Sequence, residues 1–331
     1  MKRGRGRFLK CGDWVEVRSA SEILATLDED GELESLPFMP EMLKLCGRRF
    51  QVYKRAEKTC DRIEKKGLRR LNGAVHLPEV RCDGASHGDC QAGCLLIWKE
   101  AWLEPVDGPA TGEAARAPAE PPRDERVERL HVATRRSPRE DEPAGDYYRC
   151  QATELNRAST PLPYSDLRQY WRDVRSGNVR LRTVLWWAVT VALDAVQRIP
   201  KTYRLVEFLR GPFREPRVEG RAVKTPKLEL HLEPGELVRV KPLQEITATL
   251  DPRLRNRGLS FDREMVKYCG RTHRVLRRVD RCIDEPTGRM LHMKGDCIIL
   301  DKVVCEGTYH GFCPKEIYPY WREIWLERVN E

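Results

Sequence analysis

The sequence has little of what several common enzyme motifs require. It contains no glycine-rich phosphate loop, no dinucleotide-binding fingerprint and no His-Glu-x-x-His pair. Those absences point away from nucleotide-binding and zinc-peptidase classes. The tight Cys-x-x-Cys knuckles of many structural zinc sites are missing as well. The sequence alone therefore leaves open whether the protein is an enzyme.

Long hydrophobic runs are also absent. The longest, residues 184–193, has about half of the ~20 apolar residues that a membrane span needs, and Asp194 ends it. The basic residues 1–10 are followed by no apolar segment of the kind found in secretory signal peptides. We therefore expect a cytoplasmic protein without a membrane span, in which cysteines stay reduced.

Cysteine, in contrast, is plentiful, with 12 residues in a chain of 331. In a reducing compartment, clustered cysteines more often hold metal or carry out redox chemistry than form disulfides. The formal net charge of +9 gives only weak support for a nucleic-acid partner, because acidic and basic residues are mixed everywhere except in residues 1–10. A protein partner is expected instead.

An internal duplication dominates the sequence. Residues 12–106, the first copy, align from end to end with residues 235–329, the second copy. The segment from Cys82 to Cys90 matches that from Cys305 to Cys313, and a Trp-Leu-Glu string follows in both copies. What two divergent copies retain is expected to serve the unit that they share.

The linking regions differ in composition from the copies. Residues 107–146 are charged and proline-rich, which predicts a flexible linker. Residues 180–198 predict a helix that is apolar on every side and therefore buried between domains or against a partner. Further helices are expected at 165–175 and 203–209. The predicted organisation is a basic arm (1–11), a first barrel (12–106), the linker (107–146), a helical connection (147–234) and a second barrel (235–331).

Short strands dominate the pattern inside each copy. Strands are expected at 14–17 and 237–240, and a short helix with Pro40 in its first turn is expected to end at a cap on Gly47. Asn72-Gly73 predicts a hairpin turn between two strands. We therefore expect an α+β fold that is mainly β: two tandem small antiparallel (SH3-like) barrels with cysteine-rich metal-binding insertions, joined by a charged linker and a helical segment.

Both copies carry a shared set of candidate metal ligands. Three thiols and one imidazole per copy suit a closed tetrahedral zinc site, and they would also suffice for an iron–sulfur cluster. Glycines beside these ligands allow the backbone to wrap around a metal centre. The equivalent pairs are Cys60 with Cys282, Cys82 with Cys305, His87 with His310, and Cys90 with Cys313.

The copies differ four residues beyond this last pair. Cys94 in the first copy corresponds to Ile317 in the second, so Cys94 is either a fourth thiolate ligand or a core thiol. If it is a ligand, the first copy has four thiolates without His87. The second copy then needs His310 or Cys297 to complete its set.

Other conspicuous residues have plainer interpretations. If residues 90–102 are helical, Cys90, Cys94 and the two tryptophans share one stripe. We expect core packing for the tryptophans and for Cys46 and Cys269, and a polar strand face for His76 and His292. Cys150 is interpreted as a packed cysteine, with a ligand role as the alternative, and Asp83 and Glu306 as turn-capping residues.

Several strings of the first copy resemble uncharacterised bacterial proteins with a duplicated cysteine-rich unit. They include residues 12–18, residues 36–43, Cys46-Gly-Arg-Arg-Phe50 and Arg81-Cys-Asp-Gly84 with the cysteines that follow. The resemblance implies a bacterial, cytoplasmic protein, and it brings no activity with it.

Three functions fit these patterns. The irregular spacing of the cysteines favours iron–sulfur centres slightly over zinc, which would indicate electron transfer or redox support of a partner enzyme. A zinc-stapled tandem-barrel module that binds protein or nucleic acid is the second. The third is an iron–sulfur enzyme with an open cluster position in the first copy.

Overall fold

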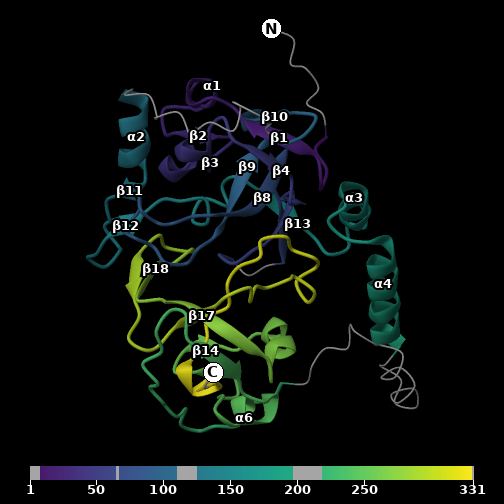
Figure 1. Cartoon of the computed structure of the whole chain (residues 1–331), viewed down its shortest axis with the longest axis vertical. Helices are drawn as coiled ribbons and strands as arrows, with labels where there is room; N and C mark the ends of the chain where they lie inside the picture. Colours follow the sequence, from purple (N-terminus) through teal and green to yellow (C-terminus); the bar gives the residue numbers. More distant parts are fainter. Residues whose placement is uncertain (1–7, 65–66, 110–124, 197–217, 330–331) are drawn as a thin grey trace. The chain divides into compact units, whose positions relative to one another are not determined.

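The computed structural model describes residues 8–64, 67–109, 125–196 and 218–329. The chain is α+β with more strand than helix, as the sequence predicted. It divides into two compact units (Figure 1). Unit 1 comprises Met1–Leu167, Val279–Lys294 and Cys313–Ile317, and unit 2 comprises Arg168–Arg278, Gly295–Phe312 and Tyr318–Glu331. Unit 1 therefore combines the first copy with two segments of the second.

Unit 1 is built from small antiparallel sheets. In the first sheet, β1 (Trp14–Val17) lies between β10 (Leu103–Pro105) and β4 (Arg49–Gln51). The predicted strand at 14–17 is confirmed. Further strands are β2 (Glu32–Leu33), β3 (Leu36–Pro37), β5 (Lys54–Arg55), β6 (Lys58–Cys60), β7 (Leu68–Arg70), β8 (Ala74–Arg81), β9 (Leu95–Lys99), β11 (Arg135–Arg136), β12 (Tyr147–Tyr148), β13 (Thr160–Leu162), β18 (Arg281–Ile283) and β19 (Met290–His292).

Unit 2 contains one larger sheet with the strand order β20-β17-β14-β21. Strand β14 (Leu237–Val240) confirms the prediction for residues 237–240. The other strands are β15 (Arg255–Asn256), β16 (Leu259–Ser260), β17 (Thr272–Arg278), β20 (Ile298–Leu300) and β21 (Leu326–Arg328). No sheet among the described residues closes on itself, so the SH3-like barrels stay a prediction.

Short helical segments recur at equivalent positions of the two copies. Helices α1 (Ala20–Leu24) and α6 (Leu243–Ala248) follow the first strand of each copy. The 3-10 helices η1 (Pro40–Leu45) and η6 (Arg263–Tyr268) come next, and η2 (Glu100–Trp102) and η7 (Glu323–Trp325) precede the last strand. Gly47 takes the left-handed conformation (φ 75°) just beyond η1, which confirms the predicted cap.

The predicted hairpin at Asn72-Gly73 is wrong. Strand β7, before the turn, pairs with β6 and β13, whereas β8, after the turn, pairs with β5 and β9. A type I′ turn needs positive φ at both central residues. Here Gly73 has φ 55° and Asn72 is absent from the positive-φ residues, so the chain leaves one sheet and enters another.

The stretch 107–146, predicted to be a flexible linker, contains a helix. Residues 110–124 lie outside the described residues, but Glu125–Ala133 form α2, on which Leu130 is buried. The segment between Pro122 and Pro138 has no proline, and its apolar residues Val127 and Leu130 lie three apart, on one helical face. That face packs against the unit 1 core.

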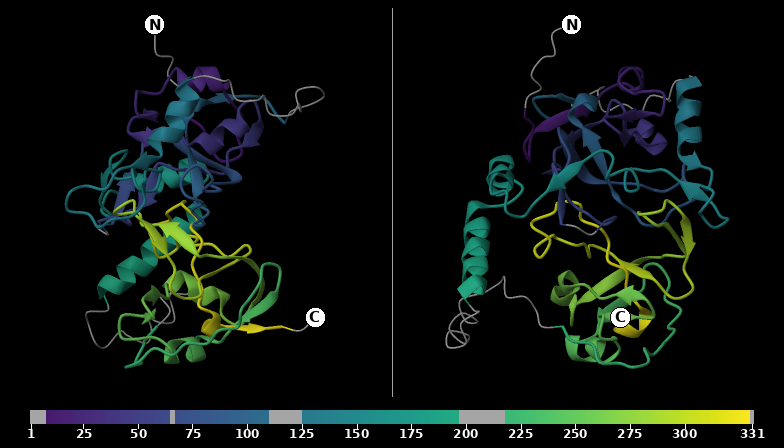
Figure 2. Two further views of the ribbon diagram at one scale, coloured as in Figure 1. Left: turned by 90° about the vertical axis from the view of Figure 1, so that its left-hand side faces the viewer. Right: turned by 180° about the vertical axis from the view of Figure 1, so that it is seen from behind.

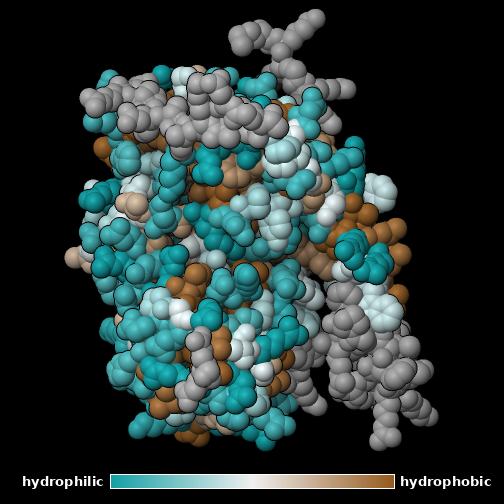
Figure 3. All heavy atoms as spheres, viewed as in Figure 1, coloured by the Kyte–Doolittle hydropathy of each residue, from teal (hydrophilic) through white to brown (hydrophobic). Residues whose placement is uncertain are grey.

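Helices α3 (Arg168–Ser176) and α4 (Leu181–Val196) confirm two of the predicted helices, and Gly177 ends the first with φ 81°. Figure 2 shows them from two further sides. The third, at 203–209, lies outside the described residues. Burial of α4 between domains or against a partner stays a prediction: within the chain, Leu185 and Val189 in its first half are at least half exposed, and apolar atoms gather there (Figure 3). No described helix is long and apolar enough to cross a membrane.

The tryptophans shared by the copies form the centre of each core. Trp98 and Trp102 are fully buried, as are Trp321 and Trp325, which confirms core packing. Phe38 packs edge-on against Trp102, with 5.1 Å between ring centroids. The helical stripe is wrong, however, because Trp98 lies on strand β9 and Trp102 on η2.

Candidate metal centres

Three side chains of the first copy converge on one point. Glu41 projects from η1, and Cys82 and His87 lie on the loop that follows β8. One donor atom of each lies within 4.8 Å of the other two. Cys82 Sγ is 3.3 Å from His87 Nε2 and 3.2 Å from Glu41 Oε1. An oxygen, a sulfur and a nitrogen donor therefore share one small space.

A chain of hydrogen bonds orients His87. Ser86 Oγ donates to Glu41 Oε2, and the same hydroxyl oxygen lies 3.1 Å from His87 Nδ1. Because the single hydroxyl proton of Ser86 goes to the carboxylate, Nδ1 of His87 donates to Ser86 Oγ. The Nε2 lone pair then faces Cys82. Metal-binding histidines are commonly fixed in this way, with one ring nitrogen donating to a neighbour.

Burial controls the protonation of this group. Burial lowers the pKa of His87, so its imidazole is neutral at pH 7, although the Glu41 carboxylate opposes the shift. Burial, with the Glu41 charge in second place, raises the pKa of Cys82. Cys82 therefore remains a thiol and donates to Glu41 Oε1. A metal ion bound here would replace that proton.

The second copy contains the same group inside unit 2. Glu264, Cys305 and His310 again have one donor atom each within 4.8 Å of the others. Glu264 is 3% exposed, and burial raises its pKa. His310 is more accessible than His87, and its Nε2 lies 3.3 Å from Oδ1 of Asp262, at the position that Met39 occupies in the first copy. The two groups thus share ligand types but differ in accessibility.

A glycine turn shapes both ligand loops. In the first copy, the backbone N–H groups of His87 and Asp89 both donate to Gly84 O, each at 3.0 Å. In the second, His310 and Phe312 donate to Gly307 O in the same pattern. Gly84 has φ 77°, and a Cβ atom there would lie 2.2 Å from Cys90 O. Only glycine fits that position without a shift of the backbone.

The other predicted ligands form different pairs. Cys60, at the end of β6, lies against Cys313, because its backbone N–H donates to Cys313 Sγ at 3.1 Å. Cys90 Sγ accepts from the backbone N–H of Ile283, next to Cys282, at 3.4 Å. Cys60 of the first copy therefore lies beside Cys313 of the second, and the segment with Cys282 and Ile283 of the second copy lies beside Cys90 of the first, all within unit 1.

Cys94 lies near the charged groups Lys315, Glu285 and Arg62 and near other thiols of unit 1. Burial, followed by the charges of Glu41, Cys94 and Cys150, raises the pKa of Cys82. Burial raises the pKa of Cys94 to about 11 and that of Cys150 to about 12, and Cys90 contributes to both shifts. Four thiols on three stretches of chain thus affect one another electrostatically. Cys150 also packs in the unit 1 core, as the sequence suggested, and the partly buried Cys94, for which ligand and core roles were both open, packs against it.

The remaining candidates lie outside the two glutamate–cysteine–histidine groups. Cys46 is buried and Cys269 packs against the unit 2 core, which confirms core thiols. Cys297 is 2% exposed, and Arg322 Nη1 lies 3.7 Å from its sulfur. His76 is 2% exposed, so the polar strand face predicted for it is wrong, whereas His292 is exposed. Asp83 accepts from Ala85 N at 3.2 Å, which confirms its turn role.

Sequence reasoning missed the two glutamates. Glu41 and Glu264 stand in the matched strings Glu-Met-Leu-Lys-Leu-Cys-Gly and Glu-Met-Val-Lys-Tyr-Cys-Gly. That match was the available signal, but an isolated glutamate about 40 residues before a cysteine gives no spacing that identifies a metal site. Only the fold brings η1 onto the ligand loop.

Residues Gly84-Ala-Ser-His-Gly88 also have the spacing of a serine nucleophile elbow, which the sequence interpretation overlooked. That motif requires a strand, a sharp turn and then a helix. Here the turn lies between strands β8 and β9, and the Ser86 hydroxyl donates a hydrogen bond to Glu41. The second copy has Tyr309 at the same place. The geometry therefore gives Ser86 an orienting role.

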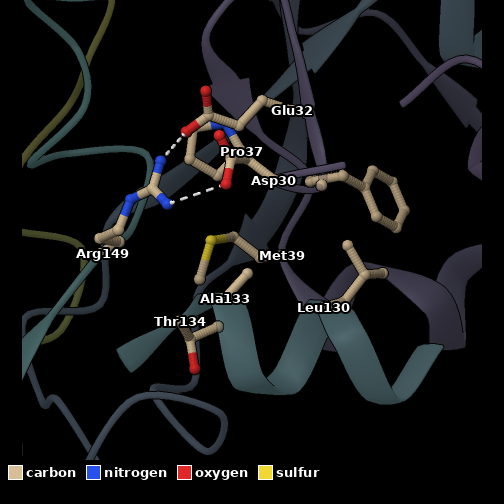
Figure 4. Close-up of a pocket in the computed structure, with 10 residues that line it drawn as sticks. Asp30, Glu32, Pro37, Met39, Leu130, Ala133, Thr134 and Arg149 are labelled. Atoms are coloured by element: carbon tan, nitrogen blue, oxygen red, sulfur yellow. Dashed lines mark hydrogen bonds and ion pairs between the residues drawn. The ribbon is translucent and has the colours of Figure 1, made fainter. Parts of the chain in front are cut away.

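A small pocket of unit 1 lies where α2 meets β2 and β3 (Figure 4). Arg149 forms ion pairs there with Asp30 and with the buried Glu32. Leu130 and Met39 supply apolar walls. Both carboxylates in this pocket are paired with Arg149, and the residues that line it include no cysteine or histidine, so it resembles a structural junction more than a reactive site.

Comparison of the chain with protein-family models, with curated proteins and with solved structures finds no match.

Proposed function

We propose that the protein is a metal-binding protein with one zinc ion in each copy. Glu41, Cys82 and His87 would hold the first ion, and the second would lie on the equivalent residues Glu264, Cys305 and His310. The observation that carries this proposal is the recurrence of one glutamate–cysteine–histidine group, with a buried glutamate, at matched positions of two divergent sequences.

The mixed donor set favours a single zinc ion over a cluster. Zinc accepts carboxylate, thiolate and imidazole ligands in one tetrahedral site. Iron–sulfur clusters are held mostly by thiolates, which lie around a larger inorganic core. A separation within 4.8 Å suits donors that surround one ion. Three protein ligands also leave one tetrahedral position for water or another ligand.

The two ions would differ in role. In the first copy, Glu41 and His87 are buried, at 8% and 1% exposure, so an ion there would fasten η1 to the ligand loop. In the second copy, the His310 side chain is 36% exposed. Its ion would be open to exchange or to an added ligand.

An iron–sulfur centre is the second candidate, and the mutual influence of Cys82, Cys90, Cys94 and Cys150 supports it. Such a centre would suit electron transfer to a partner enzyme. Cys82 belongs to both candidate sites, whereas Cys150 belongs only to the cluster. The substitution Cys150→Ala therefore distinguishes them.

The test is metal analysis of protein purified without oxygen. Zinc binding predicts a colourless protein with two zinc ions per chain and no loss of metal in Cys150→Ala. A brown protein that contains iron and acid-labile sulfide, and loses both in Cys150→Ala, would replace the zinc proposal with the cluster.

A further inference from the structure

Cys60 and Cys313 form a close pair that the proposed zinc sites do not use. They are 253 residues apart in sequence, yet both belong to unit 1. The backbone N–H of Cys60 donates to Cys313 Sγ at 3.1 Å, and the Cys60 thiol also donates a hydrogen bond to that sulfur. The fold thus places one thiol from each copy in contact.

The surroundings of Cys313 stabilise a thiolate. The thiol of Cys60 and the backbone N–H groups of Cys60 and Lys315 all donate to its sulfur, and the Lys315 ammonium is close. The hydrogen bond from Cys60 is the largest effect, and the pKa of Cys313 falls to about 6 despite burial. At Cys46, where a single backbone hydrogen bond opposes burial, burial raises the pKa to about 11.

The positive charge beside this sulfur is itself held in place. Lys315 Nζ lies 3.0 Å from a carboxylate oxygen of Glu285, and Arg62 lies 3.4 Å from the other oxygen. Glu285 raises the pKa of the buried Lys315 amine, so the ammonium persists at neutral pH. The Cys94 thiol also lies near Lys315 and affects its pKa. Tyr164 is another titratable group near the pair, and the charges of Cys60 and Cys313 raise its pKa further, after burial.

We propose that Cys60 and Cys313 are a redox-reactive dithiol, which hydrogen peroxide converts to a disulfide that joins the two copies. Cys313 is 3% exposed and Cys60 is partly exposed. A small oxidant therefore suits the pair better than a bulky disulfide. Reactive cysteines typically combine a stabilised thiolate with a neighbouring resolving thiol.

The chemistry proceeds in two steps. The Cys313 thiolate attacks one oxygen of the peroxide, the O–O bond breaks, hydroxide leaves, and a sulfenic acid forms on Cys313. Cys60 then loses its proton and attacks Cys313 Sγ, the S–O bond breaks, and a second hydroxide leaves. The hydroxides take up protons, so two thiols and one peroxide yield one disulfide and two waters. A dithiol reductant reverses the oxidation.

The test treats the reduced full-length protein with hydrogen peroxide and maps its peptides without reduction. The expected product links peptide Thr59–Arg62 to peptide Val303–Lys315, with the mass of two hydrogens lost. Because the second peptide also contains Cys305, fragment ions must place the bond on Cys313. A bond on Cys305, or no bond involving Cys60, would overturn the proposal.

Variants separate the two thiols. Cys60→Ser should stop the reaction at a sulfenic acid that dimedone traps on Cys313. Cys313→Ser should slow peroxide consumption about tenfold, because a stabilised thiolate is mostly ionised at pH 7 and an ordinary thiol is not. Cys269→Ser, which alters a core thiol, should behave like the unaltered protein. Equal rates in all three variants would contradict the proposal.

Metal analysis keeps this inference apart from the zinc proposal. Oxidation should proceed while the zinc content stays constant, because neither thiol belongs to the proposed ligand groups. If a chelator must first remove metal before Cys60 and Cys313 react, the pair is a ligand pair and the proposal fails.

Discussion

Cys82 keeps its proton because burial and the neighbouring Glu41 carboxylate both disfavour another negative charge. Metal ions bind the thiolate, so the ion and the proton compete for the same sulfur. His87 offers no second competition near pH 7, since burial lowers its pKa. Metal binding in the first copy therefore depends on the loss of one proton, that of the Cys82 thiol.

Zinc affinity of the first copy should rise about tenfold per pH unit near neutrality, because binding releases one proton. Competition with a chelator of known pH dependence measures this slope. The matched variant Cys82→Ser should lose the slope together with most of the affinity. An unaltered protein whose first-copy affinity does not change with pH would show that Cys82 is no ligand.

His76 shows a second effect at the scale of one residue. It is fully enclosed, its Nδ1 lies 2.9 Å from Leu96 O, and burial lowers its pKa to about 4. The unfolded chain, with an ordinary histidine pKa near 6.5, binds the proton more tightly. Stability from the neutral ring is thus complete above about pH 6.5 and declines as the pH falls toward 4.

The free energy of unfolding should fall by up to about 3 kcal/mol across that window. Urea unfolding of His76→Gln should show a smaller dependence on pH over the same range. The exposed His292→Gln serves as control and should keep the slope of the unaltered protein. Identical slopes in all three proteins would contradict the assigned burial effect.

At the scale of elements, the ligand loop depends on Gly84, whose positive φ and contact with the Cys90 backbone exclude a side chain. Gly47 is the natural comparison. It has nearly the same φ, +75°, but no atom lies within 4 Å of its would-be Cβ. An added side chain would meet an unfavourable backbone conformation at both positions. Only at Gly84 would it also overlap other atoms.

Gly84→Ala should therefore destabilise the protein by about 2 kcal/mol more than Gly47→Ala. Only Gly84→Ala should also weaken zinc binding in the first copy. Chemical denaturation and metal titration of the two variants measure these effects. Equal losses would mean that the loop adjusts without cost.

Local patterns predicted the elements whose residues interact with near neighbours. Strands β1 and β14, helices α3 and α4 and the Gly47 cap follow from alternation and capping residues. Asn72-Gly73 failed as a hairpin because the strands on its two sides belong to different sheets and pair with other strands. Cys82 and His87 were identified from the sequence because they lie five residues apart on one loop. Glu41 was not, because it reaches Cys82 only when the fold brings two segments 41 residues apart into contact.

At the scale of the whole molecule, the two copies are not independent. Gln91 N donates to Arg281 O at 3.1 Å, Tyr148 N donates to Gly288 O at 2.8 Å, and Glu316 accepts from Tyr53 at 2.7 Å, all within unit 1. Unit 1 therefore includes two segments of the second copy, which hydrogen-bond to the first.

A fragment of residues 1–167 should accordingly lack a cooperative unfolding transition, although it contains the complete first copy. Co-expression with residues 168–331 should restore the transition, because that fragment supplies both missing segments. Urea unfolding followed by tryptophan fluorescence makes the comparison. A fragment as stable as the full chain would show that the second-copy segments are dispensable.

Stoichiometric titration of the metal-free protein with Co²⁺, a spectroscopic substitute for zinc, tests the central claim most directly. Two equivalents should bind the unaltered chain with a sulfur-to-cobalt charge-transfer band, because each group contains one cysteine. Glu41→Gln should abolish one equivalent, Glu264→Gln the other, and the double variant both. Two equivalents retained in the double variant would contradict the assignment of a glutamate–cysteine–histidine metal site to each copy.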